Sequence, residues 1–318
     1  MNLIAAKQLT KRFGDHTAVD NVSLFVERGE VVGFLGPNGA GKSTTMRMIA
    51  GFLEPDSGST AICDYDVSER PIDAKRRLGY LPEGAPAYSD MTVSDFLTFV
   101  GRIRGLAEQK LNNRLAEMVD QINLTGVWNQ QIETLSKGFK RRVGIAQALI
   151  HDPDVLILDE PTDGLDPNQK HEMRTLIQSI APNKAIIVST HILEEVEAVC
   201  SRAVIIDAGK VVADETPHDL VARAADGNAI RITFAGEQAT DSLVEKLKPL
   251  AGDGTVHVVG TFNGGTRVLV RPNGSAGPSP SELAASIAAT DLVVEDIGVN
   301  RPRLEDVFRE ITGRQQIN

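Results

Sequence analysis

The sequence predicts an α/β fold for residues 1–218 and a smaller α+β unit for residues 219–318. Three short apolar runs that lead into glycine or polar residues indicate buried strands, at 31–35, 155–158 and 184–189. Segments with a helical spacing of apolar residues separate these runs, which is the order typical of an α/β domain. The chain has 318 residues, and its composition shifts towards Gly, Ser, Thr and Ala from about residue 225. Because this length exceeds one average domain, we expect two domains.

The composition is that of a soluble globular protein, with 42% hydrophobic and 24% charged residues. No apolar run reaches the roughly 18 residues that a membrane-spanning helix needs, and the N-terminus does not resemble a signal peptide. We therefore expect a cytoplasmic chain. The formal net charge of −10 argues against a nucleic-acid partner bound by charge. Cys63 and Cys200 lack the spacing of metal ligands and are expected to be packed or idle.

The strand at 31–35 is followed by the spacing G-x-x-x-x-G-K-S, which is that of a phosphate-binding loop, or P-loop. The loop consists of Gly36, Pro37, Asn38, Gly39, Ala40, Gly41, Lys42 and Ser43. Its glycines let successive backbone N–H groups surround phosphate oxygens, and the helix that begins near Lys42 adds its dipole. Lys42 is expected to reach the β- and γ-phosphates, and the Ser43 hydroxyl to coordinate Mg²⁺. We expect the whole loop and Thr44 to bind a nucleotide.

Two other interpretations of this loop are weaker. A glycine-rich turn with a solvated lysine would not need all the positions of the motif between a strand and a helix. A dinucleotide-binding loop has the spacing G-x-G-x-x-G without lysine, and the frame that starts at Gly39 fails at Thr44.

Ahead of the P-loop, residues 3–8 and 18–27 alternate apolar and polar positions and are predicted to be paired strands. Phe13 lies in the turn between them. An exposed aromatic at this place could stack on a base, whereas the alternative is a phenylalanine at the edge of the core.

The strand at 155–158 runs into two carboxylates, Asp159 and Glu160. Neighbouring side chains on a strand point to opposite faces, so the two acids are expected to have different roles. Asp159 suits a contact to Mg²⁺, and Glu160 suits polarising the water that attacks the γ-phosphate. His191 follows the strand at 184–189 and could sense the γ-phosphate by hydrogen bonding, although a histidine at a strand end is usually structural.

A mostly helical segment is predicted from residue 92 to about residue 125. Further on, Ser136 and Gly138 lie just ahead of another helix, where they could form a second anion site. An ordinary helix N-cap would have the same residues, so this signal alone is weak.

Five motifs occur here in one order: the P-loop, Leu135-Ser136-Lys137-Gly138-Phe139, Leu158-Asp159-Glu160-Pro161, Gly164-Leu165-Asp166-Pro167 and His191. This order resembles the ATPase subunit of an ABC transporter, over residues 1 to about 218. The resemblance implies a mixed sheet core with a helical subdomain at about 84–150, and ATP and Mg²⁺ as ligands. It also implies that Phe13 stacks the adenine and that Ser43, Glu83 and Asp159 serve the metal.

The resemblance implies further roles for single residues. Glu160 would be the catalytic base, His191 would contact the γ-phosphate, and Asp166 would lie in a loop that communicates between subunits. Glu83 would lie in the loop that links the nucleotide to a permease.

The resemblance also implies partners. Such ATPases bind two ATP between head-to-tail subunits, with Ser136 and Gly138 of one chain closing on the P-loop of the other. One ATPase unit per chain therefore predicts a homodimer, and the resemblance adds integral-membrane permease subunits. It places the chain peripherally on the inner face of the cell membrane.

Three residues depart from the family pattern. Glu83 replaces a glutamine, Lys137 replaces a glycine of the signature, and Phe139 stands where the pattern has glutamine. Glu83 could still contact Mg²⁺ or the attacking water. The contact role of the signature then depends on the Ser136 hydroxyl and the backbone N–H of Gly138.

Two stretches, 79–83 and 304–313, resemble the ABC-2 type subgroup that drives two-chain export systems. The stretch 81–88 is similar to the ATPase of the gliding-motility type. Within the helical segment 84–110, some apolar side chains could line a groove for a permease helix or pack in the core: Tyr88, Met91, Phe96 and Phe99.

The C-terminal part is predicted to have the order β-α-β-β-α-β, as in a ferredoxin-like unit. Its strands are expected at 229–234, 255–260, 266–271 and 292–298, and its helices at 239–250 and 281–289. The turn at Asn263, the loop 272–280 and a terminal helix at 303–311 complete it. Such a unit could stabilise a dimer, pack on the ATPase domain or regulate it.

Two other functions fit the sequence less well. A soluble ABC-type ATPase acting on ribosomes or DNA would usually carry two ATPase units, long coiled coils or a basic surface. A regulatory scaffold without hydrolysis would not need Glu160. The sequence thus predicts an ATP-hydrolysing motor subunit of a membrane ABC export system.

Overall fold

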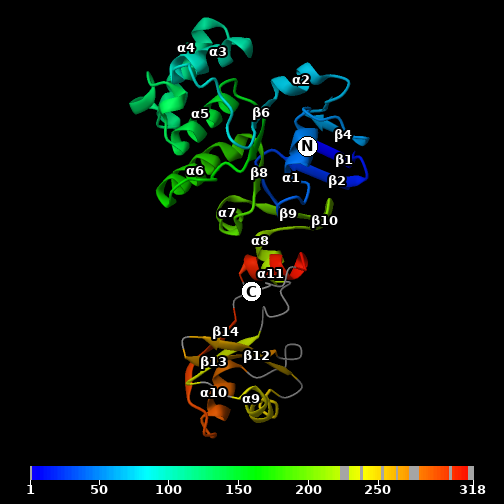
Figure 1. Cartoon of the computed structure of the whole chain (residues 1–318), viewed down its shortest axis with the longest axis vertical. Coiled ribbons are helices and arrows are strands. Elements are labelled where there is room, and N and C mark those ends of the chain that lie inside the picture. Colours follow the sequence, from blue (N-terminus) through cyan, green and yellow to red (C-terminus); the bar gives the residue numbers. More distant parts are fainter. Residues whose placement is uncertain are drawn as a thin grey trace. The chain divides into compact units, whose positions relative to one another are not determined.

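The structure is a computed structural model that describes residues 2–222, 229–236, 239–251, 254–262, 264–271, 279–300 and 303–313. The chain forms two compact units, Met1–Pro217 and His218–Asn318. Figure 1 labels most of the elements of both units.

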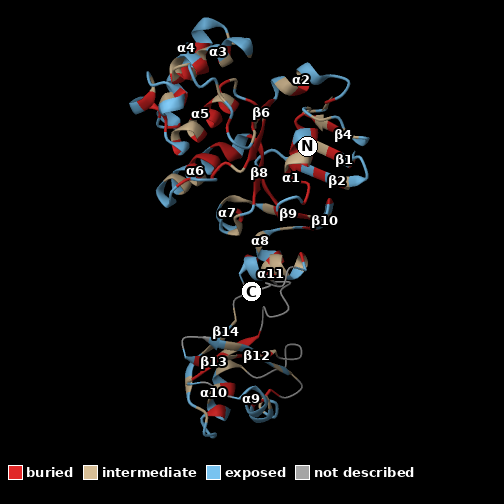
Figure 2. Ribbon diagram, in the orientation of Figure 1, coloured by how far each residue is buried: buried red, intermediate tan, exposed pale blue. Residues whose placement is uncertain are grey.

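The first unit is built around a six-stranded sheet with the order β10-β9-β3-β8-β7-β6. Its strands are β3 (Val31–Leu35), β6 (Leu78–Leu81), β7 (Val155–Asp159), β8 (Ala185–Thr190), β9 (Arg202–Asp207) and β10 (Lys210–Glu215). All neighbours are parallel except β9 and β10, so the sheet is mixed as predicted. The strands β3, β7 and β8 are buried along their whole length, which explains their continuous apolar runs (Figure 2). Their carboxyl ends therefore meet at one edge of the sheet.

A second, antiparallel sheet has the order β2-β1-β4-β5. Its strands are β1 (Asn2–Phe13), β2 (His16–Glu27), β4 (Ser57–Ile62) and β5 (Tyr65–Asp66). The first two are longer than the alternating patterns predicted, and they turn at Gly14 and Asp15. Helix α1 (Lys42–Ile49) shares one hydrophobic core with β1, β2, β3 and β7.

The helical part contains α3 (Val93–Ile103), α4 (Glu108–Gln121) and α5 (Lys137–Leu149). The mostly helical segment predicted from residue 92 to about residue 125 is confirmed, and it is divided into α3 and α4 by a break. Gly105 has a φ of 78° there, a conformation that ends a helix. The helices pack on a separate hydrophobic core, together with one face of the central sheet and α6 (Pro167–Ile180). In Figure 1 these helices lie on the opposite side of the central sheet from β1, β2 and β4.

Shorter elements complete the first unit. They are α2 (Pro71–Arg76), α7 (Leu193–Val199) and three 3₁₀ turns at Thr125–Val127, Ile132–Thr134 and Ala181–Asn183, and α8 (Pro217–Ala222) begins at the last residue of this unit. Helix α2 begins at Pro71, which suits its first turn because a missing N–H costs nothing there. Burial raises the pKa of Cys63 to about 11 and of Cys200 to about 12, as expected for packed thiols.

The second unit has the predicted order β-α-β-β-α-β. Its elements are β11 (Ile230–Phe234), α9 (Thr240–Leu247), β12 (Thr255–Phe262), β13 (Gly265–Arg271), α10 (Pro280–Ile287) and β14 (Val294–Val299). The antiparallel sheet order is β12-β13-β11-β14, a ferredoxin-like arrangement with its own core under α9 and α10. Helix α11 (Leu304–Ile311) follows. Asn263 and residues 272–278 of the predicted turn and loop lie outside the described residues.

Candidate active site

The P-loop connects β3 to α1 at the edge where the parallel strands end. Two of its glycines have neighbours that leave no room for a side chain. A Cβ at Gly36 would lie 2.4 Å from the carbonyl oxygen of Ile206, and one at Gly41 would lie 2.4 Å from that of Ala18. Gly41 also has a φ of 105° and caps α1. The close packing of the loop on the sheet therefore requires glycine at both positions.

Lys42 is buried beneath this loop, with 7% of its surface exposed. Its Nζ donates hydrogen bonds to the carbonyl oxygens of Gly36 at 2.7 Å and Pro37 at 3.2 Å. Burial lowers the pKa of Lys42, and the carboxylates of Glu160, Asp159 and Glu83 oppose this shift. The buried ammonium group of Lys42 thus lies among acidic groups.

The two carboxylates after β7 differ in their surroundings. Strand β7 ends at Asp159, and Glu160 has a left-handed φ of 50°, so it has already left the strand. The strand-alternation argument for separating the two acids is therefore wrong, because this backbone turn separates them instead. Asp159 is 2% exposed, and its Oδ1 has no hydrogen-bond partner among the described residues. The backbone N–H of Glu160 donates to the carbonyl of Ser189 at 2.9 Å, which ties this turn to β8.

His191 and Glu160 form a pair across the ends of β7 and β8. The His191 Nδ1 lies 3.0 Å from Oε1 and 2.9 Å from Oε2 of Glu160, so it donates to the carboxylate. The Glu160 side chain is 13% exposed, whereas that of His191 is 53% exposed. Burial raises the pKa of Glu160, and the hydrogen bond from His191 opposes the rise.

A cavity of about 580 Å³ opens at this edge. The predicted residues that line it are Phe13, Asn38, Gly39, Gly41, Lys42, Ser43, Thr44, Glu83, Glu160 and His191. Phe13 is 52% exposed, so it lines the cavity and is not a core residue. Gly36, Pro37 and Ala40 support the loop from behind, two of them through the Lys42 hydrogen bonds.

Three residues that the sequence did not single out also line the cavity: His16, Ala18 and Asp163. His16 pairs with Phe13 in the register of β1 and β2, so the prediction of a turn next to Phe13 could have pointed to it. Asp163 follows Glu160 by three residues in a loop, where no periodicity predicts the direction of a side chain.

Ser136 and Gly138 are not among the residues that line this cavity. Ser136 is the N-cap of α5, and its Oγ accepts a hydrogen bond from the backbone N–H of Phe139 at 3.3 Å. A Cβ at Gly138 would lie 2.4 Å from Oε1 of Gln169 on α6, so the motif packs on that helix. Phe139 packs against the core of the helical part. Asp166 caps α6 by accepting from the backbone N–H of Gln169 at 2.9 Å.

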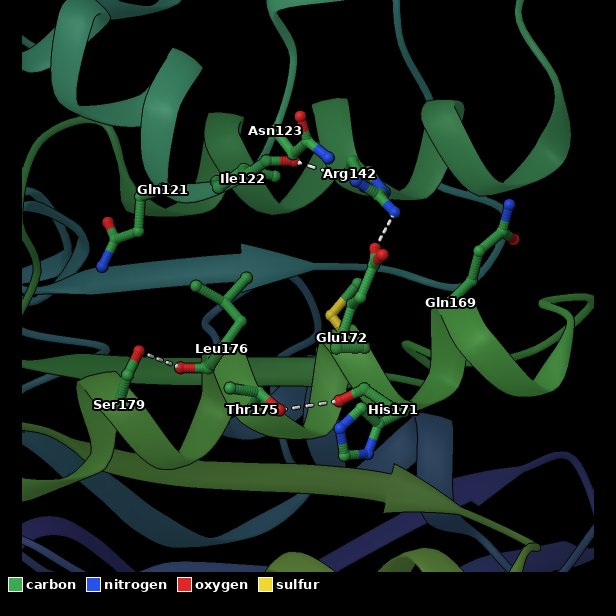
Figure 3. A pocket seen from close by; sticks show the side chains of 11 residues that line it. Gln121, Ile122, Asn123, Arg142, Gln169, His171, Glu172, Thr175, Leu176 and Ser179 are labelled. Atoms are coloured by element: carbon green, nitrogen blue, oxygen red, sulfur yellow. Dashed lines mark hydrogen bonds and ion pairs between the residues drawn. The ribbon is translucent and has the colours of Figure 1, made fainter.

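A second cavity, of about 390 Å³, lies between the end of α4, α5 and α6 (Figure 3). Arg142 reaches across it, donating to the carbonyl of Ile122 at 3.4 Å and pairing with Glu172. None of the predicted site residues lines it. These contacts connect the helical part to α6.

An apolar groove of about 800 Å³ runs between α2, α3 and the end of β6. Tyr88 and Phe99 line it, are 57% and 38% exposed, and have ring centroids 5.7 Å apart. Phe96 borders the groove but is 2% exposed, and Met91 packs against the core. The groove interpretation therefore suits Tyr88 and Phe99, and the core interpretation suits Phe96 and Met91.

The described residues hold no cluster of three or more His, Cys, Asp or Glu side chains that could bind a metal ion alone. Mg²⁺ usually needs only one or two carboxylates, because waters and substrate phosphates supply its remaining ligands. The unpartnered Oδ1 of Asp159 and the hydroxyl of Ser43, which lines the cavity, are oxygen donors of the kind that Mg²⁺ prefers.

The chain is similar to known proteins. Residues 19–163 match the family model described as ABC transporter. The chain is 34% identical to the linearmycin resistance ATP-binding protein LnrL of Bacillus subtilis, over 98% of this chain and 99% of the relative. The chain belongs to the ATP-binding subunits of ABC transporters. This is a family of ATPases, so the chain is an ATP-binding, ATP-hydrolysing protein.

Other members of this ATP-binding family are also similar. The chain is 34% identical to the Nod factor export ATP-binding protein I of Cupriavidus metallidurans, over 98% of each chain. A solved structure of an ATP-binding subunit of an ABC transporter matches with a TM-score of 0.65 and 32% identity. That match covers 70% of this chain and 92% of the other. In the part of this ABC protein that the structure describes, no helix combines the length and apolarity required to cross a membrane.

Proposed function

We propose that this chain is the ATP-hydrolysing motor subunit of a membrane ABC export system, which dimerises on two ATP and drives a separate permease. The observation that carries the proposal is the pairing of Glu160 with His191 in the same cavity as the P-loop. Two similar proteins are named for linearmycin resistance and for Nod factor export, which supports an export role.

The nucleotide would be held by groups at both ends of the cavity. Phe13 would stack on the adenine, because its exposed ring lies at the cavity wall. Backbone N–H groups of the P-loop and the positive end of α1 would surround the phosphates, with Thr44 in the first turn of the helix. Lys42 would exchange its carbonyl partners for phosphate oxygens, which are stronger acceptors.

Ser43, Asp159 and Glu83 would hold Mg²⁺. Asp159 fits this role because its buried Oδ1 lacks a hydrogen-bond partner among the described residues, and a buried unpaired oxygen is costly unless a ligand satisfies it. Glu83 lines the cavity with an exposed side chain and can supply a further carboxylate oxygen. Mg²⁺, when bound, neutralises charge on the β- and γ-phosphates.

Glu160 would act as the general base that orients and polarises the attacking water. Its burial raises its pKa, which brings the basicity of the carboxylate closer to what a base needs near neutral pH. His191 would hold the carboxylate in place through Nδ1 and present its other ring nitrogen to the γ-phosphate.

The dimer is proposed because Ser136 and Gly138 lie outside the cavity of their own chain. As the N-terminus of α5, they offer backbone N–H groups to an anion, and the nucleotide of a second copy would supply that anion. Two copies arranged head to tail would then complete two sites, with Asp166 in the loop between them.

The permease would dock in the groove lined by Tyr88 and Phe99. Tyr80 and Pro82 line this groove, and the next residue, Glu83, lines the nucleotide cavity. The end of β6 thus connects the two, so closure around ATP would move the docked membrane partner. Such a subunit would be peripheral on the inner face of the cell membrane.

The test is a Glu160→Gln variant, with Glu69→Gln on the exposed turn before α2 as the matched control. The variant should bind ATP, accumulate as a dimer in light scattering and lose turnover by about 10²- to 10⁴-fold, because only the general base is removed. The control should behave as wild type. Turnover unchanged in Glu160→Gln would contradict the assignment of the base.

The partner is tested by purifying the tagged Glu160→Gln chain from detergent-solubilised membranes with ATP. A multi-span membrane protein that co-purifies in stoichiometric amount is the expected outcome. Ribosomal proteins or nucleic acid in its place would favour a soluble ATPase and contradict the export proposal.

A further inference from the structure

A buried carboxylate lies behind the pair of Glu160 and His191. It belongs to Glu195 on α7, whose side chain is 4% exposed. Nothing in the nucleotide-binding arrangement described above uses this residue, and it does not line the cavity.

One oxygen of Glu195 accepts hydrogen bonds from the loop after β7 and from the last residue of β8. Thr162, two residues after Glu160, donates its Oγ1 proton to Oε2 of Glu195. Thr190, directly before His191, donates its Oγ1 proton to the same oxygen at 3.3 Å. Both threonines are buried, at 2% and 0% exposed. The segments that carry Glu160 and His191 are therefore tied to a single atom.

The groups around Glu195 offset only part of the free energy that desolvation of its carboxylate costs. The Nζ of Lys170, on α6, lies 3.9 Å from Oε1, which has no hydrogen-bond partner among the described residues. An apolar side chain of similar size would fill the same space at lower cost. What an apolar side chain could not provide is the directional contact to the two hydroxyls.

The same two segments are also joined on the cavity side by the contact of His191 with Glu160. The His191 side chain is 53% exposed. An exposed contact of this kind contributes little by itself, because water competes for both partners. The buried contact through Glu195 is shielded from water and is the stronger constraint on the spacing of the two segments.

We infer that Glu195 is a positioning residue for hydrolysis. Through Thr162 and Thr190 it sets the distance between Glu160 and His191, and so the place where the attacking water is held. This inference rests on the proposed function, since it assumes that Glu160 is the base. It concerns the chemical step and predicts no effect on nucleotide affinity.

The experiment compares Thr162→Val with Thr162→Ser in the full chain, measuring kcat, KM for ATP and equilibrium binding of a fluorescent ATP analogue. Valine has the shape of threonine without the donor, so kcat should fall about 10- to 100-fold, while KM and the binding constant stay within about twofold. Serine keeps the hydroxyl and should restore most of kcat. Thr175→Val is the matched control, because the Thr175 hydroxyl donates to the carbonyl of His171 at 3.0 Å on the exposed face of α6.

A second variant covers the case in which Thr162→Val does not fold. Glu195→Met leaves the buried hydroxyls of Thr162 and Thr190 without their acceptor, so it should lose kcat, and a melting curve gives the folded fraction to which kcat is normalised. Wild-type turnover in either variant would overturn the inference. So would a loss of affinity that matches the loss of kcat, or a Thr162→Ser chain as slow as Thr162→Val.

The outcomes separate this inference from the proposed function. If the wild-type chain did not hydrolyse ATP, or if Glu160→Gln were as fast as wild type, the proposed function would fail. If both behaved as proposed and Thr162→Val matched wild type, only the role of Glu195 would be refuted.

Discussion

The two units of this chain are both built from β-α-β pieces around a sheet with its own core, yet among the residues that the structure describes only the first brings candidate catalytic side chains together. In the first unit β3, β7 and β8 are parallel, so the loops that follow them leave from one edge. In the second unit neighbouring strands of the sheet are antiparallel, so the loops that follow adjacent strands leave from opposite edges. Strand direction, more than composition, thus decides where polar side chains can converge.

The charged groups of the two units differ in their burial. The first unit buries Lys42 near Asp159 and Glu160, where burial shifts the pKa values of Lys42 and Glu160. In the second unit, the Lys246 Nζ lies 2.7 Å from Asp291, and these side chains are 39% and 77% exposed. Exposed pairs of this kind contribute little to stability because water screens them, whereas a buried charge influences chemistry.

The largest expected effect on turnover is that of replacing a lysine by methionine, compared between the two units. Lys42→Met removes the buried cation, so turnover should fall by about 10³-fold and ATP affinity by at least about tenfold. Lys246→Met removes a surface cation, and turnover should stay within about twofold. Steady-state ATPase rates and nucleotide binding check both. Equal losses in the two variants would contradict the contrast between the units.

The sequence predicted the parts of the site that a local spacing encodes. The P-loop could be recognised because its glycines, Lys42 and Ser43 are contiguous, and Glu160 and His191 because each ends an apolar strand. Glu195 could not, since its partner Thr162 lies 33 residues away and only the packing of α7 brings them together. The left-handed conformation of Glu160 could not be predicted either, because tertiary contacts impose this conformation on a residue type that does not favour it.

The elements of the fold also divide into those that a local pattern predicts and those that it does not. Buried strands and the β-α-β-β-α-β order of the second unit could be predicted from hydrophobic periodicity. The break between α3 and α4 was missed, although Gly105 was a signal for it. Strands β9 and β10 were missed as well. The mixed character of the central sheet, in which β10 pairs antiparallel to β9, was expected from family resemblance and not from any pattern in the residues.

The second prediction concerns the acid limb of turnover. Glu160 must be ionised to act as a base, and burial raises its pKa above the ordinary value of 4.5. At saturating ATP, kcat should therefore fall as pH drops through this raised pKa, by about tenfold per pH unit below it. His191→Ala removes the hydrogen bond that lowers the pKa, so its acid limb should move to higher pH. His257→Ala in the second unit should leave the limb in place, and a shift there would contradict the assignment.

The third prediction concerns stability in acid. Burial lowers the pKa of His151 to about 4 from an ordinary value of 6.5, and its Nε2 lies 3.0 Å from the carbonyl oxygen of Leu78. The unfolded chain therefore binds more protons between these pH values, so stability is fully present above pH 6.5 and is lost as pH falls towards 4, by about 2–3 kcal/mol.

Urea unfolding at several pH values checks this loss. His151→Gln offers an amide to the same carbonyl without a titrating group, so its stability should depend less steeply on pH in this window. His218→Gln, with a side chain that is 89% exposed in wild type, should not change the dependence. An unchanged slope in His151→Gln would assign the acid sensitivity to other groups.

The smallest expected effect is that of removing the second unit. The cores of the two units share no residue, so a chain of residues 1–222 should keep its fold and bind ATP within about threefold of the full chain. The single tryptophan, Trp128, packs against the core of the helical part and reports on the first unit alone. Its fluorescence should therefore give the same thermal midpoint in both chains. A midpoint lowered by the truncation, together with weaker ATP binding, would mean that the second unit supports the site, and the contrast between the two units would become a dependence of one on the other.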